Sequence, residues 1–357
     1  MSVYAVLGAG NGGRALAAIL KHMGHEVKQW SRSANALTDT GAQRSIEVTG
    51  QVTLCVSIDN VTCNMAEAVD EAEIVFLVVP ANAHRDVARL LAPHIRGDQG
   101  IVLNPGRTAG VVEVRNTLLE CGCHELPIIL ETQSLFCACR NCGPHSVNVI
   151  SFKKDNNISC IPADRFHEVS GKLSAIYKSM TLVPSALHTG LENIGAILHP
   201  APVLLNAGWI ESRDIFFPHY YCGISRSVAQ FLEKLDDERL RVAQQYGVQV
   251  RSVKTWHEDM YGCKGDNLFE TLQKNSAYAS IDAPRTLMHR YLTEDIPTGL
   301  VPISELGHAA GVKTPLMDML IDLGTVLLGT NFREEGRNLR RLGLEGKSLD
   351  AIKAAFE

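Results

Sequence analysis

The 357-residue chain lacks a long uninterrupted hydrophobic run. Its longest apolar candidate, residues 316–328, is broken by Asp318 and Asp322 and is too short to cross a bilayer. The N-terminus also lacks the basic segment and the following apolar segment of a signal peptide. We therefore expect a cytoplasmic protein that does not span a membrane.

An excess of basic residues is absent as well. The chain has 34 Lys and Arg residues against 39 Asp and Glu residues, a formal net charge of −5, which gives no support for nucleic-acid binding. Hydrophobic residues (45%) and charged residues (20%) stand in the proportions of an ordinary soluble globular protein. A chain of this length is long enough for two domains, and we expect its partners to be small molecules.

Ten cysteines are present, and five of them lie within residues 121–142. Disulfides are not expected in a cytosolic protein. A structural zinc site usually pairs two Cys-x-x-Cys elements or adds histidines at a set spacing. Cys137, Cys139 and Cys142 match this pattern only loosely, so no metal site is predicted; zinc, with two histidines nearby, is the less favoured alternative.

The first thirty residues have the pattern of a dinucleotide-binding βαβ unit. An apolar run at 4–7 enters the turn GAGNGG at 8–13, and an alanine-rich helix is expected to follow. Gly8 permits the tight turn, Gly10 lets a pyrophosphate approach the backbone, and Gly13 allows the helix to pack on the strand. The helix N-terminus favours the anion. A glycine turn without a ligand is the alternative. The predicted cofactor-binding residues of this turn are Gly8, Gly10, Asn11, Gly12 and Gly13.

Residues 26–30 are predicted to form the second strand, and no acidic residue follows it. Sites specific for NAD usually place Asp or Glu there to accept hydrogen bonds from the ribose hydroxyls. This chain has Ser31-Arg32-Ser33 instead, and a guanidinium between hydroxyls suits a 2′-phosphate. We therefore expect Ser31 and Arg32 to bind the cofactor and favour NADP over NAD; the alternative is that Arg32 is a solvated loop cation. Lys28 would contact the phosphate only if the strand ended earlier.

Several further apolar runs in the first half predict strands buried on both faces. The run at 74–79 stops at Pro80 and Ala81, and ligands of open α/β sheets bind outside the carboxyl ends of strands. We therefore expect Pro80 and Ala81 to approach the nicotinamide ribose. Strands and helices alternate through this half, which predicts a doubly wound, mostly parallel sheet in a Rossmann domain of residues 1–184.

From residue 187 onward the pattern becomes helical, which predicts an all-α domain of residues 185–357. One helix should bury an apolar face of Val228, Phe231, Leu232 and Leu235 and solvate an acidic face of Glu233, Asp236, Asp237 and Glu238. A second helix should begin after Thr314, with proline in its first turn. Its predicted core stripe is Leu316, Met319, Leu320, Leu323 and Leu327.

Two segments of this helical half carry side chains suited to chemistry. Pro200 should end or kink a helix at His199, which leaves an imidazole at a helix end. Residues 289–299 place Arg290 and Asp295 before another proline. A histidine base needs an orienting carboxylate, and a carboxylate substrate is held well by a guanidinium. From the residues alone, a structural histidine and a surface ion pair stay open as alternatives.

Short motifs in a consistent order extend over nearly the whole chain. They lie at 5–13, 103–106, 131–132, 198–200, 204–207, 290–291, 294–295, 298–302 and 304–307. In this order and spacing the chain resembles the opine dehydrogenases of the octopine dehydrogenase type, which include bacterial N-(1-carboxyethyl) amino acid dehydrogenases. No single motif is specific, but together they are.

The resemblance implies NAD(P)H-dependent, reversible condensation of a pyruvate-like α-keto acid with the amino group of an amino acid. By the same resemblance His199 is the general acid and base, Asp295 orients it, and Arg290 binds a substrate carboxylate. Asn193 is a further expected substrate contact. Some relatives carry a second asparagine where this chain has Gly195, so specificity is expected to differ.

Two other functions fit parts of the pattern. A ketopantoate reductase-like dehydrogenase of 2-keto acids has the same two-domain architecture, but such enzymes use a lysine for proton transfer, and no lysine here stands in a motif like that of His199. A non-catalytic NADPH-binding sensor would keep the glycine turn and Arg32 without needing His199. Either a monomer or a homodimer is compatible with the sequence.

Overall fold

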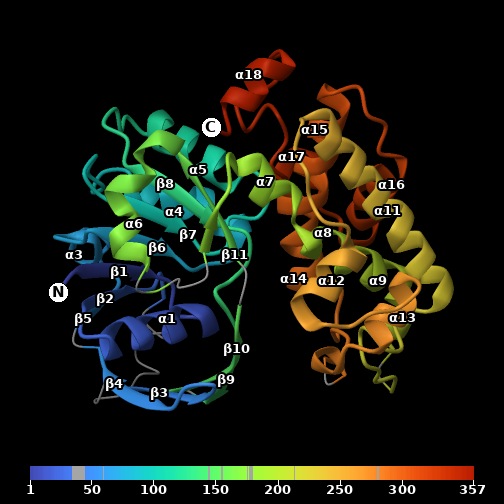
Figure 1. Ribbon diagram of the computed structural model, residues 1–357, viewed down its shortest axis with the longest axis horizontal. Helices are drawn as coiled ribbons and strands as arrows, with labels where there is room; N and C mark the ends of the chain where they lie inside the picture. The colour runs from blue at the N-terminus through green and yellow to red at the C-terminus, as the bar shows by residue number, and fades with distance from the viewer. Residues whose placement is uncertain are drawn as a thin grey trace. The chain divides into compact units, whose positions relative to one another are not determined.

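The computed structural model describes residues 1–33, 45–58, 60–143, 145–153, 156–174, 176, 180–212, 214–279 and 281–357. They form two compact units, one of Met1–Thr189 with Phe356–Glu357 and one of Gly190–Ala355. In Figure 1 the first is largely blue to green and the second largely yellow to red. The domain boundary between residues 184 and 185 stays a prediction from the sequence.

The first unit is built on an eight-stranded sheet of order β12-β11-β8-β7-β6-β1-β2-β5. Neighbouring strands pair in parallel except β8 with β11, which is antiparallel. The predicted doubly wound, mostly parallel sheet is confirmed. The strands are β1 Val3–Leu7, β2 Glu26–Trp30, β5 Asn60–Thr62, β6 Ile74–Leu77, β7 Gly100–Leu103, β8 Ile128–Thr132, β11 Asn156–Ile161 and β12 Met180–Leu182.

Central strands of this sheet are apolar throughout because they are covered on both faces. Every residue of β6 and β7 is buried. Tyr4, Phe76 and Leu130 belong to one continuous core. The helices and helical turns of this unit are α1 Asn11–His22, α3 Met65–Val69, η1 Ala81–Ala83, α4 His84–Leu91, α5 Gly110–Glu120, η2 Ala163–Phe166 and α6 His167–Ser174.

A second, four-stranded sheet in this unit has the order β4-β3-β10-β9. Its strands are β3 Ser45–Gly50, β4 Leu54–Ser57, β9 Cys137–Gly143 and β10 Ser146–Phe152. The sheet packs on α1, whose Leu20 shares the core with Val48 and Val147. Cys137, Cys139 and Cys142 therefore lie in strand β9, and all ten cysteines, each in the described part of the chain, are free thiols.

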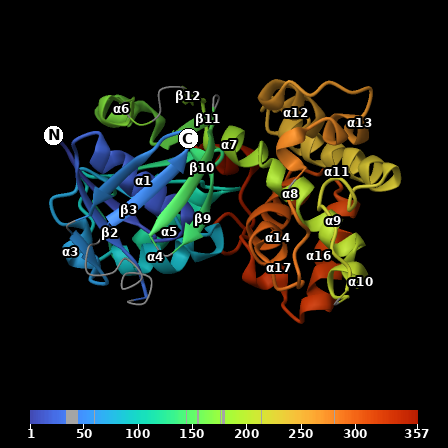
Figure 2. The ribbon, with the colours of Figure 1, turned by 90° about the horizontal axis from the view of Figure 1, so that it is seen from below.

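The second unit is helical, which confirms the predicted all-α C-terminal domain (Figures 1 and 2). No helix among the described residues is long and apolar enough to span a membrane. Helix α7, Ala186–Leu191, runs across the division between the units. The other elements are α8 Ile194–Leu198, α9 Pro200–Leu205, α10 Ala207–Ile210, α11 Arg226–Gln245, α12 Val253–Tyr261, α13 Leu268–Gln273, η3 Ser276–Tyr278, α14 Arg290–Thr293, the π-turn η4 Ile296–Leu300, α15 Val301–Ala309, α16 Pro315–Leu328, α17 Phe332–Glu335 and α18 Leu349–Ala354.

Helix α11 is the longest helix described in this unit and packs against α8, α9, α13, α15 and α16. Leu232 and Leu235 are buried, as predicted. The predicted solvated acidic face is wrong in part, because Asp236 and Glu238 are also buried. Asp236 accepts hydrogen bonds from Arg239 Nε at 2.8 Å and from Val253 N at 2.7 Å. Because α11 is packed on several sides, polar side chains on its buried faces must be hydrogen-bonded to other groups of the protein.

The core stripe predicted for α16 is also wrong in part, although Leu320 is buried as predicted. The buried residues are Met317, Leu320, Ile321 and Gly324, whereas Met319 and Leu327 of the predicted stripe are 43% and 44% exposed. This helix is apolar around most of its circumference, so its periodicity allows two faces. Gly324 selects one of them, because a Cβ there would lie 2.7 Å from Cδ1 of Ile296.

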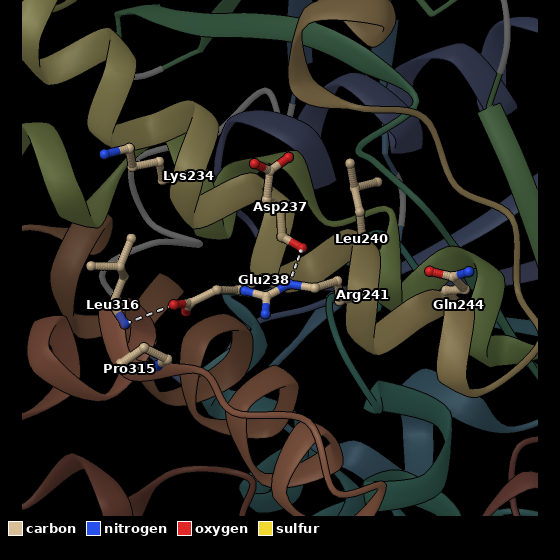
Figure 3. Close-up of a pocket in the computed structure, with 8 residues that line it drawn as sticks. All are labelled: Lys234, Asp237, Glu238, Leu240, Arg241, Gln244, Pro315 and Leu316. Atoms are coloured by element: carbon tan, nitrogen blue, oxygen red, sulfur yellow. Dashed lines mark hydrogen bonds between the residues drawn. The ribbon is translucent and has the colours of Figure 1, made fainter.

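The start of α16 is capped from another helix. Pro315 stands in the first turn as predicted, but the Thr314 side chain makes no capping hydrogen bond within the described chain. The buried Glu238 carboxylate of α11 accepts instead from Leu316 N at 2.9 Å (Figure 3). It also accepts from Met317 N at 3.0 Å. Glu238 also lines the cavity drawn in Figure 3, which none of the predicted site residues lines.

Candidate active site

The glycine turn of the first unit follows β1. Gly8 has a φ of +132°, and a Cβ there would lie 2.3 Å from the Val78 carbonyl oxygen. A Cβ on Gly13 would lie 2.1 Å from the Gly8 carbonyl oxygen. At Gly10, by contrast, no atom of the described chain lies within 4 Å of the Cβ position. Gly8 and Gly13 are thus required by close backbone packing, while Gly10 leaves open space beside the backbone.

Helix α1 begins directly after this open position. Arg14 N donates to the Gly10 carbonyl at 2.9 Å, so the first helical hydrogen bond closes over the turn. The preceding N–H groups, on Asn11, Gly12 and Gly13, lack intrahelical acceptors. The first turn carries no acidic residue. The residues present therefore fit a dinucleotide pyrophosphate, which needs N–H donors and the positive end of a helix dipole.

Ser31 and Arg32 lie directly after β2, whose last residue is Trp30. Ser31 is buried and its Oγ accepts from Ser33 N at 3.3 Å, whereas Arg32 is exposed. Because β2 continues to Trp30, Lys28 lies within the strand, and its Nζ donates to the Asp70 carbonyl at 2.7 Å. The Lys28 ammonium group therefore has a structural partner, and the conditional phosphate contact considered for it is not favoured. Residues 34–44, which follow this loop, lie outside the described part of the chain.

Pro80 and Ala81 lie after β6, which pairs in parallel with β1. Val78, at the start of this loop, donates its N–H to the Leu7 carbonyl at 2.9 Å and packs against Gly8. Ala81 is buried and begins η1. The loop after β6 and the glycine turn are therefore neighbours at the carboxyl ends of adjacent strands, where open α/β sheets bind ligands.

In the second unit, His199 lies at a break between two helices. Helix α8 ends at Leu198 and α9 begins at Pro200, as the proline predicts. His199 Nδ1 lies 2.7 Å from Asp295 Oδ2. The Asp295 side chain is fully buried and the His199 side chain is 18% exposed. A carboxylate on Nδ1 fixes the tautomer with the proton there and leaves Nε2 for proton transfer.

The face of the His199 ring is covered by Tyr291, a residue that the sequence identified only as part of a motif. The two rings are stacked, with centroids 4.1 Å apart and an interplanar angle of 15°. His289 caps the helix that carries Tyr291, since its Nδ1 accepts from Tyr291 N at 3.3 Å. The orientation of the imidazole is thus fixed by the hydrogen bond to Asp295 at one ring nitrogen and by the stacking of Tyr291 on one ring face.

Arg290 begins α14, next to Tyr291 in the chain. Its guanidinium pairs with Glu294 Oε2 at 3.0 Å, and its side chain is 59% exposed whereas that of Glu294 is buried. The structure therefore does not pair Arg290 with Asp295. An ion pair in which one partner is this exposed is weak, so the guanidinium is accessible to an exogenous carboxylate.

Asn193 precedes α8 and is buried. Its side chain makes no capping bond to a described residue of that helix. It packs beside η4, because a Cβ on Gly299 would lie 3.2 Å from Asn193 Nδ2 and 2.7 Å from Ala196 Cβ. Gly299 therefore allows α8 and η4 to approach closely. The substrate contact expected of Asn193 stays a prediction.

Two further histidines close to His199 were not singled out by the sequence. Burial, followed by the proximity of His199, lowers the pKa of His219 to about 3. Burial and the neighbouring Arg290 guanidinium lower the pKa of His289. Both imidazoles are therefore neutral at physiological pH. Neither residue could be identified from periodicity, because each lies in a loop. The sequence feature that could have pointed to them is the high density of His and Tyr around residues 219–221 and 289–291.

The described residues contain no group of three or more His, Cys, Asp or Glu side chains that could hold a metal ion. The second unit does carry an imidazole paired with a carboxylate and an exposed guanidinium. A His–Asp pair moves protons, and an accessible guanidinium binds a carboxylate.

Comparisons with known proteins agree with both units. Residues 182–328 match the family model for the alpha-helical domain of NAD/NADP octopine/nopaline dehydrogenase. Residues 3–118 match the model for the N-terminus of NAD-dependent glycerol-3-phosphate dehydrogenase. The opine dehydrogenase of Arthrobacter sp. (strain 1C) is 39% identical over 355 residues, which cover 99% of this chain and 98% of that protein.

Solved structures show the same fold at lower identity. A structure of octopine dehydrogenase, described as a complex with NADH and pyruvate, has a TM-score of 0.78 at 22% identity and covers 100% of this chain and 99% of the other. Yersinopine dehydrogenase with NADP⁺ bound has a TM-score of 0.73 at 16% identity and covers 99% and 97%. With the full-length identity to the Arthrobacter enzyme, these findings establish that the chain belongs to the opine dehydrogenases, NAD(P)-dependent oxidoreductases that act on CH–NH donors.

Proposed function

We propose that this enzyme condenses pyruvate, or a similarly small α-keto acid, with the amino group of an amino acid, and that NADPH is its preferred reductant. The product is an N-(carboxyalkyl) amino acid, and the reaction is reversible. The pairing of His199 with Asp295 at 2.7 Å is the observation that carries the proposal. A reductive condensation needs several proton transfers at one centre, and this pair supplies a group suited to them.

The proton transfers follow from the order of bond changes. The amine attacks the keto carbon, and the carbonyl oxygen gains a proton to give a carbinolamine. The hydroxyl then gains a second proton and leaves as water, which produces an iminium. A reduced nicotinamide, when bound, would supply the hydride that this iminium needs to become a secondary amine. His199 Nε2 accepts a proton from the attacking amine and passes it to the carbonyl oxygen; it then takes a second proton from solvent and donates it to the leaving hydroxyl.

Asp295 and Tyr291 act on His199 rather than on the substrate. The buried Asp295 carboxylate keeps the proton on Nδ1 and stabilises the imidazolium that forms when Nε2 accepts a proton. Tyr291 keeps the ring from rotating about its Cβ–Cγ bond, because the two rings are stacked. The imidazole is thus oriented before the substrate binds.

Arg290 binds a substrate carboxylate in this proposal. Its guanidinium is accessible, and its ion-pair partner among the described residues is Glu294, which directly follows the same short helix. A bidentate guanidinium–carboxylate pair would fix the direction of the reacting carbon. Since both substrates carry a carboxylate, the proposal assigns Arg290 to one of them without choosing which. Asn193 is a proposed further contact.

The preference for NADPH depends on Ser31 and Arg32. The exposed Arg32 guanidinium follows β2 where NAD-specific sites have an acid. The related enzymes differ in this respect: one solved relative is described with NADH and another with NADP⁺. A cytoplasmic location stays a prediction from the sequence, which is also compatible with a homodimer.

The test is cofactor oxidation by the purified enzyme with a panel of α-keto acids headed by pyruvate, each with and without a panel of amino acids. We expect turnover only when both substrates are present, faster with NADPH than with NADH at equal concentrations, and a secondary amine dicarboxylate by mass spectrometry. Turnover with the keto acid alone would instead indicate a simple 2-keto acid reductase.

A further inference from the structure

Three imidazoles surround the ring of Tyr291. Its centroid lies 4.1 Å from that of His199, 4.6 Å from that of His289 and 5.0 Å from that of His219. The three histidines come from separate segments of the second unit, so the cluster is a product of the fold. His219 is therefore part of the environment of His199, although the mechanism above does not use it.

The hydrogen bonds of the three imidazoles differ. His199 Nδ1 is bonded to Asp295, and His289 Nδ1 accepts the backbone N–H of Tyr291. His219 is 1% exposed, and its Nε2 has no hydrogen-bond partner in the part of the chain that the structure describes. A buried imidazole nitrogen without a partner is costly. Such atoms in native proteins usually serve a ligand or a bound water.

The chemistry of the partner follows from the protonation of His219. The ring makes a hydrogen bond with the Leu198 backbone. Because Nε2 has no partner, this bond uses Nδ1, and a carbonyl oxygen accepts only from a protonated nitrogen. Nε2 of the neutral ring is then an acceptor. The low pKa of His219 agrees with this assignment. The missing partner must be an N–H or O–H donor.

We propose that His219 is a substrate-binding residue whose Nε2 accepts a hydrogen bond from the amino nitrogen of the amino acid substrate. This inference rests on the proposed function, in which an amine reacts beside His199. An α-keto acid has no N–H to offer, so the contact is selective for one of the two substrates. Holding one N–H directs the lone pair of the free amine toward the keto carbon.

Two substitutions separate this role from a structural one. In His219→Asn the amide nitrogen can replace Nδ1 and keep the bond to Leu198, but no atom reaches the Nε2 position. In His219→Gln the longer side chain can bring its amide oxygen near that position as an acceptor. We expect His219→Asn to raise KM for the amino acid by about tenfold or more, the effect of one lost hydrogen bond in a buried site. We expect His219→Gln to recover most of this loss.

The KM values for the keto acid and the cofactor should change less than about twofold in both variants. Equal changes in KM for both substrates, or a His219→Asn enzyme that behaves as wild type, would overturn the proposal and leave a structural histidine or one bonded to water. Thermal melting shows whether each variant folds. Wild-type turnover that requires both substrates is measured first, so failure of the proposed function is recognised separately.

A measurement on the wild-type protein tests the proposal even if the variants do not fold. In protein labelled with ¹⁵N-histidine, contacts between its ring protons and those of Tyr220, whose ring centroid lies 4.7 Å away, identify the imidazole of His219. A saturating amino acid, added without keto acid, should shift its Nε2 resonance, while the keto acid alone should not. An unchanged Nε2 resonance at saturation would contradict the proposal.

Discussion

The region proposed to bind the cofactor, in the first unit, consists mainly of backbone, whereas the region proposed for proton transfer, in the second unit, consists of side chains. In the first unit the region is backbone: Gly8, Gly10 and Gly13 matter because they have no side chain. In the second unit it is a set of side chains, His199, Tyr291 and Asp295, held at the ends of short helices. Substitutions in the first region should therefore act on binding and folding, and substitutions in the second on chemistry.

The difference also concerns what each region tolerates. Adding a methyl group at Gly13 places it against backbone, which cannot move aside as a side chain can. In the second unit a glutamine of similar size at the partly exposed His199 should alter the packing little and remove the group to which we assign proton transfer. The following predictions test this contrast, from the largest expected effect to the smallest.

Replacing the acid–base group should have the largest effect. We expect His199→Gln to lower kcat by about 10²- to 10⁴-fold, the usual contribution of a positioned proton-transfer group. Thermal melting should be within a few degrees of wild type, because the ring is at a helix break and partly exposed. Steady-state rates with both substrates saturating provide the measurement. A kcat within threefold of wild type would remove His199 from the mechanism.

The glycine turn offers a matched pair of substitutions. Gly13→Ala should weaken NADPH binding and also lower the melting temperature, because its Cβ would lie 2.1 Å from the Gly8 carbonyl oxygen. Gly10→Ala should leave the melting temperature unchanged, because that Cβ meets no described atom within 4 Å. It should still weaken NADPH binding by about tenfold or more, since the methyl group occupies the space where a pyrophosphate approaches.

Fluorescence titration with NADPH and calorimetry of the free protein measure both quantities for this pair. Unchanged NADPH binding in Gly10→Ala would mean that the pyrophosphate does not approach the backbone there. An unchanged melting temperature in Gly13→Ala would contradict the close packing of α1 on the turn.

The cofactor preference should respond to one guanidinium. We expect Arg32→Ser to raise KM for NADPH by about 10- to 100-fold, the worth of a charge-assisted contact to phosphate. KM for NADH should change less than about threefold, because NADH has no 2′-phosphate for Arg32 to bind. Initial rates with each cofactor at saturating substrates give the ratio. Equal changes for both cofactors would show that Arg32 does not distinguish them.

The smallest effect is expected far from both regions, at the cap of α16. Glu238→Ala should lower the free energy of unfolding by about 1–2 kcal/mol, because two N–H groups lose their acceptor. KM and kcat should stay unchanged. Lys234→Ala, at an exposed residue lining the same cavity, is the control and should change stability by less than about 0.5 kcal/mol. Urea denaturation distinguishes the two.

The sequence predicted the fold of the first unit well because the information there is local. The βαβ motif is contiguous, and β6 and β7 are apolar throughout because both their faces are buried. The helix break at His199 could also be predicted from local sequence, because Pro200 causes it. The pairing of His199 with Asp295 was not local, and it came only from the resemblance to a family.

The errors have a common physical origin in tertiary packing. Periodicity could not choose the buried face of α16, because that depends on the approach of Ile296 to Gly324. Buried Asp236 and Glu238 look like solvated acids until the N–H groups they accept from are known. His219 lies in a loop, where no periodicity marks a buried residue.

The central claim is that cofactor binding and proton transfer belong to separate units of the chain. Measuring the NADPH dissociation constant and kcat in both Gly10→Ala and His199→Gln tests it most directly. The account predicts that Gly10→Ala loses affinity for NADPH and keeps much of its kcat at saturation, and that His199→Gln binds NADPH as wild type does but loses at least about 100-fold in kcat. Loss of both quantities in His199→Gln, with the protein still folded, would contradict the claim.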